Sequence, residues 1–504
     1  MNEYRALQPR HSSAEKKKKQ KMKKSLLFLA LSAIIFATSC SKKDADIDPP
    51  VDGGNGNGNT ETTVDVSGDI SSNTTWTADK IYTLKGFVYV TNGATLTIQP
   101  GTIIKGDKAS KGTLTITRGA KIMAEGTADK PIVFTSSFAA GTRAPGDWGG
   151  LILLGKAPVN AGDNVSIEGG LDAKGDPAKY IQYGGSDAND NSGTLKYVRV
   201  EYAGIPFSPD NEINGITFGG VGAGTTIDYV EVFRSGDDGF EWFGGTVNAK
   251  HLLAIGSVDD DFDTDNGFSG KIQFGIAQRY VTVADVSGSN GFESDNDKDG
   301  SDKTPKTSAV FTNMTMIGPY AAANTSNVNA NHQHAAQIRR NSSISIFNSI
   351  FTGYAEGIYI DDSKVATAGA TSTNFTNGSL VIKNNLIYGC NKKGNEVKGD
   401  DATQKAKFEA KLRADNTFDA AQYGTALITD PFKYASDFSN PGTPVFTSIG
   451  AAAAGALYTD AKLNDAFFDK TGTFRGAVGA TDWTTGWTNL DAQKMPYTTP
   501  GAVK

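Results

Sequence analysis

A strand-like segment that ends in glycine recurs through the middle of the chain. In each copy, β-branched and apolar residues alternate with polar ones, which is the pattern of a half-buried strand. The seven copies lie at 195–204, 227–236, 248–257, 279–288, 309–318, 344–353 and 380–389. An up-and-down barrel would carry hairpin signals between its strands, whereas here the same strand type returns after each coil-length interval. The repeat therefore predicts a right-handed parallel β-helix, an all-β solenoid in which each coil stacks on the previous one.

A second likeness lies nearer the N-terminus. Residues 94–106 superimpose on 112–126 with a shift of 18, so that Gly101 falls on Gly119. Residues 129–137 are expected to begin the next turn of the same solenoid. The composition agrees, because 58 glycines suit short strands joined by tight turns.

The first 39 residues have the pattern of a signal peptide. A basic stretch is followed by the apolar run SLLFLALSAIIFA and by small residues before Cys40. This order predicts a signal peptide over 1–39 and a lipid on Cys40, with an ordinary secretory signal cut elsewhere as the alternative, and with Met1 or Met22 as the start. Residues 40–70 are charged and then rich in Gly and Asn, which predicts a flexible tether.

Charge limits the partners of the mature chain. The formal net charge is −6, and removal of the basic leader leaves a more acidic protein, which is a poor nucleic-acid binder. Only Cys390 remains beyond Cys40, so no disulfide framework is expected.

The rest of the chain divides by pattern. The β-helix is predicted over 71–465, with a helical insertion near 401–424. Residues 466–504 are rich in Gly and aromatic residues and are expected to cover the last coil, as solenoid ends require a cap. Trp483 and Trp487 are assigned to this cap packing.

The candidate chemistry lies in the short strand that follows each repeat. Its apolar position is expected to stack inward and the next residue to point outward. The inward positions are Phe240, Phe262, Phe292, Ile338 and Ile358, and the outward positions are Glu241, Asp263, Glu293, Arg339 and Tyr359.

This alignment gathers carboxylates from three coils into one patch. Oxygen ligands clustered in this way suit Ca²⁺, which accepts six to eight oxygens. The predicted ligands are Asp237, Asp238, Glu241, Asp259, Asp260, Asp263 and Glu293. The alternative is a solvated acidic face that Arg339, Arg234 or Lys271 partly neutralises.

A second acidic run carries Asp295, Asp297 and Asp299 at the D-x-D-x-D-G spacing of calcium loops. Lys306 stands near the place where such a loop would have its bidentate Glu. The run is either a shorter calcium loop or a solvated insertion. The pair His332 and His334 lies in an Asn-rich segment and matches no metal motif, and no Walker loop or nucleophile elbow is present.

The acidic pattern resembles that of calcium-dependent pectate lyases with a parallel β-helix. One branch of that family carries D-G-F and then V-D-D-x-x-D as calcium ligands, which here implies Asp238, Asp259, Asp260 and Asp263. In that branch a Lys follows a further N-G-F and abstracts the proton α to the uronate carboxylate. Here the residue after Asn290-Gly291-Phe292 is Glu293, and Arg339 is the conceivable base if the chain is a lyase.

The blocks TLTIQPGTIIKG, GDWGGLILLGKAPVN and FRGAVGATDWTTGWTN resemble a group of exported β-helix lipoproteins of Gram-negative bacteria. The second resemblance supports the fold, and the acidic patch together with Glu293 at the base position favours an outer-membrane lipoprotein, exposed at the cell surface, that binds calcium and an extracellular polysaccharide without robust catalysis. The alternatives are a calcium-dependent polysaccharide lyase or hydrolase, and a structural, adhesive or transporter-associated lipoprotein.

Overall fold

The computed structural model describes residues 62–208, 211–433 and 443–504. The predicted signal peptide 1–39, Cys40 and most of the predicted tether lie outside these residues. The tether was expected to extend to residue 70, but strand β1 (Thr63–Ile70) already pairs in parallel with β3 (Ile81–Val90), so the β-helix begins earlier. No helix of the described residues is long and apolar enough to cross a membrane.

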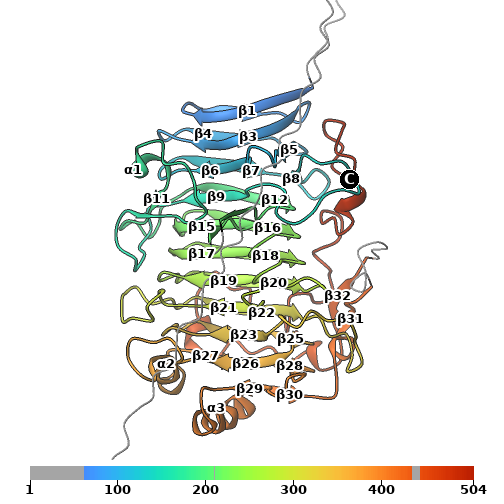
Figure 1. The fold of residues 1–504 in the computed structure, drawn as a ribbon. Coiled ribbons are helices and arrows are strands. Elements are labelled where there is room, and N and C mark those ends of the chain that lie inside the picture. The colour runs from blue at the N-terminus through green and yellow to red at the C-terminus, as the bar shows by residue number, and fades with distance from the viewer. Residues whose placement is uncertain (1–61, 209–210, 434–442) are drawn as a thin grey trace, which may run out of the picture. The chain divides into compact units, whose positions relative to one another are not determined.

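The strands stack in parallel into three sheets, which form the sides of a right-handed parallel β-helix (Figure 1). Sheet 1 contains β2 (Thr74–Trp76), β4 (Thr95–Ile98), β7 (Lys121–Glu125), the first halves of β12 (Gly193–Glu201), β16 (Thr226–Phe233), β18 (Asn248–Ile255), β20 (Lys271–Gln278) and β22 (Val310–Ile317), and then β24 (Ser345–Phe347) and β27 (Val381–Lys383).

Sheet 2 contains the first halves of β1 and β3, β5 (Ile103–Gly106), β8 (Ile132–Ser136), the second halves of β12, β16, β18, β20 and β22, and then β25 (Ile350–Thr352), β28 (Leu386–Tyr388) and β30 (Thr417–Asp419). Sheet 3 contains the second halves of β1 and β3, β6 (Thr113–Ile116), β9 (Leu151–Leu154), β15 (Ile216–Val221), β17 (Phe240–Gly245), β19 (Phe262–Asp265), β21 (Phe292–Ser294), β23 (His334–Ile338), β26 (Glu356–Ile360) and β29 (Val397–Lys398).

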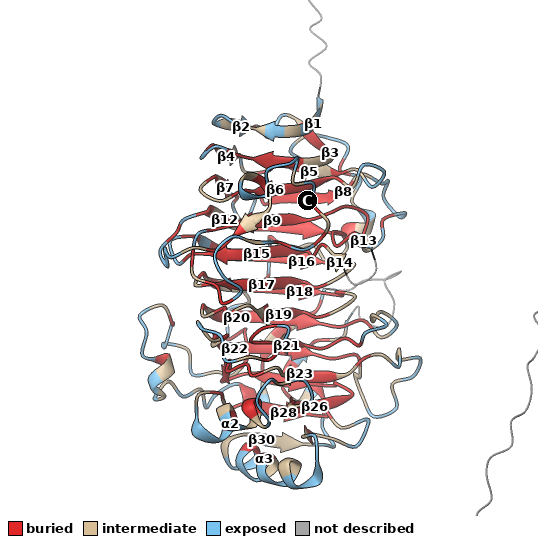
Figure 2. Ribbon diagram, turned by 60° about the vertical axis from the view of Figure 1, so that its left-hand side comes forward, coloured by how far each residue is buried: buried red, intermediate tan, exposed pale blue. Residues whose placement is uncertain are grey.

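Short elements decorate the coils. The helices are α1 (Pro177–Tyr180), α2 (Ala370–Asn377) and α3 (Ala402–Asp415), and three antiparallel pairs join β10 (Val165–Ser166) to β11 (Gln182–Tyr183), β13 (Pro206–Ser208) to β14 (Asn211–Glu212), and β31 (Ile428–Asp430) to β32 (Val445–Ser448). The inward faces of the three sheets form one continuous buried core (Figure 2).

Six of the seven repeat segments contain strands of sheets 1 and 2, and one prediction is wrong. Residues 279–288 form a loop, and β20 takes the expected position in the stack. The strand was missed because Gly275 interrupts its apolar pattern, although Met314 of the next coil fills the space beside that glycine. The likeness between residues 94–106 and 112–126 does not mark one coil of the solenoid either. Thr95 pairs with Lys121 in the next coil, and β4 and β6 belong to different sheets.

A column of left-handed residues marks the corner between sheets 1 and 2. Each strand that crosses this corner bends at one residue with φ between +49° and +63°. The column consists of Tyr197, Tyr229, His251, Phe274, Asn313, Asn348 and Asn384. The register of the paired strands stacks these residues directly on one another.

The prediction that residues 466–504 cover the last coil is wrong: this C-terminal segment lies along the side of the β-helix. Val503 O accepts a hydrogen bond from Arg199 Nη2 at 2.6 Å, and Val503 packs against Ile103 and Val133 of early coils. In Figure 1 this end of the chain lies beside β5 and β8. An aromatic, Gly-rich composition predicts packing but not its place, and the outward face of sheet 2 needs cover because it is apolar.

The last coil is closed by α3 instead. This helix lies within the segment predicted to be helical, and its Phe408 and Leu412 are fully buried in the common core. Asp401 caps the helix by accepting a hydrogen bond from Gln404 N at 2.8 Å.

Candidate metal centre

The acidic residues lie where each coil turns from sheet 2 into sheet 3. The ring of Phe240 stacks on that of Phe262 with centroids 5.6 Å apart, and Phe262 stacks on Phe292 at 5.5 Å, all inside the core. Because successive side chains alternate along a strand, the residue after each ring points outward. Glu241 pairs in register with Asp263, and Asp263 with Glu293, as the sequence predicted.

These outward carboxylates line a cleft of about 320 Å³. Ten of its twelve lining residues are acidic and none is basic. The cleft contains all seven predicted ligands: Asp237, Asp238, Glu241, Asp259, Asp260, Asp263 and Glu293. The structure thus brings the whole predicted set together in one place.

Three further carboxylates of the cleft were missed by the sequence analysis. Glu168 follows β10, Glu212 belongs to β14, and Asp285 lies in the loop 279–288 that had been assigned as a strand. All three come from excursions outside the regular coils, and an excursion carries no periodicity that would place it. The misassigned loop also brings Val286 and Ser287 to the rim.

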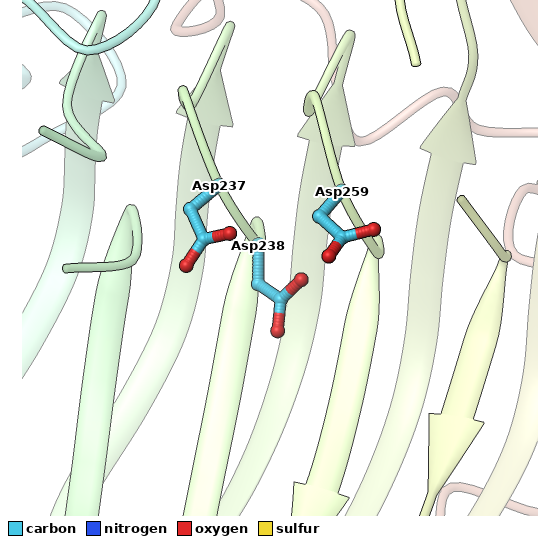
Figure 3. A group of neighbouring side chains, drawn as sticks. All are labelled: Asp237, Asp238 and Asp259. Atoms are coloured by element: carbon cyan, nitrogen blue, oxygen red, sulfur yellow. The ribbon is translucent and has the colours of Figure 1, made fainter. Parts of the chain in front are cut away.

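Three groups of carboxylates within the described residues have ligand atoms that all lie within 4.8 Å of one another. The groups are Asp237 with Asp238 and Asp259, Asp238 with Glu241 and Asp263, and Asp260 with Asp263 and Glu293. Figure 3 shows the first group, with its side chains at the turns of two neighbouring coils. Asp238 and Asp263 each belong to two groups, so adjacent cations could share them.

Part of the cluster has a structural role. Asp238 Oδ1 accepts a hydrogen bond from Asp260 N at 2.7 Å, and Asp260 Oδ1 accepts one from Asn290 N. Asn290 Oδ1 in turn accepts from His334 N at 3.1 Å. One oxygen of each side chain therefore fixes the turn of the next coil, which holds these carboxylates in place.

Other oxygens of the cluster have no such role. Asp259 Oδ1 and Asp263 Oδ1 are buried and find no hydrogen-bond partner among the described residues. A buried carboxylate oxygen without a partner is costly, because burial removes its hydration. A bound cation would supply the missing interaction.

Burial and mutual repulsion raise the pKa of the cleft carboxyls. Burial, with the charge of Asp285, raises the pKa of Asp259 to about 6. Burial and Asp295 raise the pKa of Asp263 to about 7, although Arg339 opposes the shift. The pKa values of Asp237, Asp238, Glu241, Asp260 and Glu293 are raised above their usual range, in each case first by burial. Without a cation, therefore, the cleft holds protons near neutral pH.

Asp261 is a buried carboxylate beside the cleft whose charge is neutralised by the protein itself. It lies between Asp260 and Phe262, is fully buried, and pairs with the equally buried Arg279 at 3.1 Å. Arg279 also donates to the backbone oxygens of Val258 and Asn290, both at 3.2 Å. The chain thus places a guanidinium behind the cleft, yet none lines the cleft itself.

Arg339 does not occupy the predicted position. The register pairs Glu293 with Gln337, so the outward column continues through Gln337 to Tyr359, and the inward position belongs to Ala336 and not to Ile338. Small residues at 335–336 hid the strand start, and the apolar Ile338 gave a false match. Arg339 lies beyond the strand and still reaches the site, since its Nη2 pairs with Glu293 and its Nε with Asp295 at 2.7 Å.

The other two cations offered as neutralising groups lie elsewhere. Lys271 pairs with Asp465 at 3.1 Å, and the guanidinium of Arg234 lies 5.7 Å from the ring centroid of Tyr202. Neither lines the cleft.

The residues of the second acidic run do not converge in this structure. Asp295 pairs with Arg339 and Arg340, and Asp297 accepts from Asp299 N at 2.9 Å and from the Ser301 hydroxyl at 2.5 Å. Asp299 is exposed. These bonds order a loop, and the three carboxylates form no common group among the described residues.

The histidines predicted to lack a metal role are buried and hydrogen-bonded. His332 Nε2 lies 3.0 Å from Tyr280 O, and His334 Nε2 lies 3.0 Å from Glu356 Oε2. Burial lowers the pKa of His332 to about 3.

The family model of the pectate-lyase-like β-helix domain matches residues 68–429. No curated protein and no solved structure matches the chain. The match spans every coil that contributes to the cleft.

Proposed function

We propose, from the premise that this chain belongs to the pectate-lyase-like β-helix family, that its acidic cleft binds Ca²⁺ and, through Ca²⁺, a carboxylated polysaccharide, without robust catalysis. Family membership fits a polysaccharide-related function. The proposals that the cleft binds Ca²⁺ and that catalysis is weak go beyond family membership, and they rest on the chemistry of the cleft.

The observation that carries the proposal is the composition of the cleft walls. Ten carboxyl groups and no basic residue line a space of about 320 Å³. Hard oxygen ligands at this density fit Ca²⁺, which tolerates irregular geometry and six to eight ligands. A uronate carboxylate would be repelled by the cleft alone, so a cation between the two is needed for binding.

The residue at the position of the family's base argues against efficient elimination by that mechanism. A lyase needs a group that takes the proton α to the carboxylate, and Glu293 stands where the resembling family has a Lys. Burial lowers the pKa of the Arg339 guanidinium, but the negative charges of Glu293 and Asp295 raise it by more. The net pKa of Arg339 is therefore above that of a free guanidinium. Arg339 is therefore held protonated and is a poor proton acceptor.

The N-terminal pattern adds a location to the proposal. A lipid on Cys40 would anchor the protein in the outer membrane, with residues that follow as a tether and the β-helix exposed to extracellular polysaccharide. Labelling of cells with a radioactive fatty acid tests this, since Cys40→Ala is expected to abolish incorporation.

Calorimetric titration of the metal-free protein with Ca²⁺ tests the cleft. Asp259→Asn combined with Asp263→Asn keeps the shape of both side chains and removes the negative charge of the two carboxylates whose buried oxygens lack partners, so we expect at least a tenfold loss of Ca²⁺ affinity. Asp299→Asn is the matched control, because it removes an exposed carboxylate from the second acidic run. Retained affinity in the double variant, or its loss in Asp299→Asn, would place the calcium elsewhere.

Polysaccharide binding is tested on an array of uronate and neutral polymers with Ca²⁺ and with EDTA. We expect binding of a uronate polymer only with Ca²⁺. Accumulation of an unsaturated uronate product that Arg339→Ala abolishes would show the lyase instead.

A further inference from the structure

A second pocket lies at another corner of the coils, where sheet 1 meets sheet 2. Its volume is about 300 Å³, at the lower end of the range for small-molecule sites. His251 and Phe274 of the corner column line it from the β-helix, and Phe474 and Trp483 line it from the C-terminal segment. No carboxylate of the acidic cleft belongs to it.

The pocket is built from aromatic rings. His251 stacks on Phe274 with centroids 5.3 Å apart, and Phe274 on Phe474 at 6.2 Å. Trp483 meets His251 edge to face at 5.0 Å, and its indole N–H already donates to Ala477 O at 2.8 Å. The Trp483 ring is thus fixed in orientation by the protein.

The aromatic residues stand where the backbone disfavours them. His251 has a φ of +52° and Phe274 a φ of +63°, in the left-handed region that bulky residues rarely enter. Three later coils place Asn313, Asn348 and Asn384 at the same corner, and Asn tolerates this conformation best after Gly. Tyr197 and Tyr229 share this conformation outside the pocket, so the corner itself imposes it, and the corner thereby presents the rings of His251 and Phe274 to the C-terminal segment.

Polar groups complete the pocket. His251 Nδ1 bonds to Asp228 Oδ1 at 2.7 Å, which leaves Nε2 for a ligand. Asp469 Oδ1 accepts from the backbone N–H and the hydroxyl of Thr471, at 2.8 and 2.6 Å, and its Oδ2 has no partner among the described residues. The pocket therefore offers hydrogen-bond acceptors beside flat apolar walls, and no basic residue other than His251 lines it.

We propose that this pocket binds one neutral sugar ring. The ring's C–H faces would pack between Phe474 and Trp483, and its hydroxyls would donate to Asp469 and His251. Lys250 offsets part of the charge of Asp228 and Asp469, but two carboxylates beside one lysine still favour a neutral ligand over a uronate or a phosphate. A purely apolar ligand would leave Asp469 and His251 without partners. The site goes beyond the proposed function, because it lies on a different corner and needs no calcium.

Ligand-observed NMR with glucose, galactose and mannose, and with their trisaccharides, tests the proposal on the full chain in EDTA. We expect at least one hexose to bind the wild type with a millimolar Kd, and Trp483→Ala and Phe474→Ala to weaken binding at least tenfold. Phe474→Leu keeps an apolar side chain in the wall for folding but removes the ring, and should lose binding too. Phe467→Ala is the matched control, since this ring is equally half-buried in the same segment but does not line the pocket.

Several outcomes would overturn the proposal: no hexose binds the wild type, the variants bind as well as the wild type, or choline binds the pocket while every hexose fails. Tighter binding of a trisaccharide than of its monomer would identify a polymer as the source of the sugar. The variant Asp259→Asn with Asp263→Asn must retain hexose binding, so failure of the calcium cleft and failure of this pocket are separate results.

Discussion

Two regions of this β-helix bury carboxylates, and they differ in whether a buried basic residue neutralises the charge. Beneath the C-terminal segment, Glu201 is fully buried 3.4 Å from Arg199 Nε, and it accepts a hydrogen bond from the Tyr497 hydroxyl at 2.8 Å. In the acidic cleft, carboxylates from several coils converge without a basic residue in the lining. A protein that needs a buried carboxylate only for its structure supplies the counter-charge itself. Arg339 pairs with Glu293 from outside the lining, but no basic residue stands among the ten carboxylates of the cleft, which is the property expected of a cation site.

The largest expected effect is at the compensated region. Arg199→Met removes the guanidinium that binds Trp487 O and Val503 O, and it leaves Glu201 buried without its cation. Loss of one partner of a buried pair costs about 3–5 kcal/mol, and chemical denaturation should show a decrease of this size in the free energy of unfolding. Arg413→Met, which breaks half-exposed ion pairs, should cost less than about 1 kcal/mol. Equal effects of the two substitutions would mean that the buried network is not compensated as described.

Two neighbouring aspartates test the comparison within one turn. Asp261→Asn leaves Arg279 buried without its anion and should destabilise the metal-free protein by about 3 kcal/mol. Asp259→Asn removes a charge from the repulsive cluster and should stabilise the metal-free protein by about 1 kcal/mol at pH 7.5. The measurement is the denaturation midpoint in EDTA, and a change of the same sign in both variants would contradict the assignment.

The pH dependence of stability should separate the regions further. The carboxyls of Asp259 and Asp263 have raised pKa values in the folded state, so the metal-free fold binds more protons than the unfolded chain. The stability that these two carboxyls add to the metal-free fold is therefore fully present below about pH 4. It is lost as the pH rises through the folded-state pKa values of about 6 and 7. Burial also raises the pKa of Glu231 to about 8, with the same sign. Thermal unfolding from pH 5 to 8 should show a falling Tm in EDTA.

Calcium should reduce only part of the fall of Tm between pH 5 and pH 8. It should remove the part that the cleft carboxyls cause, whereas the part caused by Glu231 should persist until Glu231→Gln is introduced. A slope that Ca²⁺ leaves unchanged would argue that the cleft does not bind it.

The smallest expected effect concerns Arg339. Its guanidinium contacts Glu293 and Asp295 and so competes with a cation for Glu293. Arg339→Gln should tighten Ca²⁺ binding by less than about tenfold, which calorimetry can resolve. A weaker affinity would mean that Arg339 organises the site and does not compete with it.

The sequence predicted the fold and the centre of the cleft because both follow from periodicity. A Phe at each inward position fixes the register of three coils, and the register fixes which side of the strand carries Glu241, Asp263 and Glu293. The prediction for Arg339 failed where the inward residue is the small Ala336, since a small residue leaves no apolar signal. Glu168 and Glu212 could not be predicted, because they reach the cleft from excursions whose length and path depend on tertiary packing.

The path of the C-terminal segment has a consequence for how the chain acquires its structure. Stacked coils need only contacts between neighbours, and such contacts form quickly as a chain emerges. The contacts of Arg199 with Trp487 and Val503, by contrast, span 288 and 304 residues. Until residues 487–503 arrive, the outer face of the early coils must remain uncovered, with Glu201 and Arg199 open to water. Folding of this solenoid therefore finishes beside coils that can form first, and loss of residues 487–503 alone would uncover coils that were synthesised much earlier.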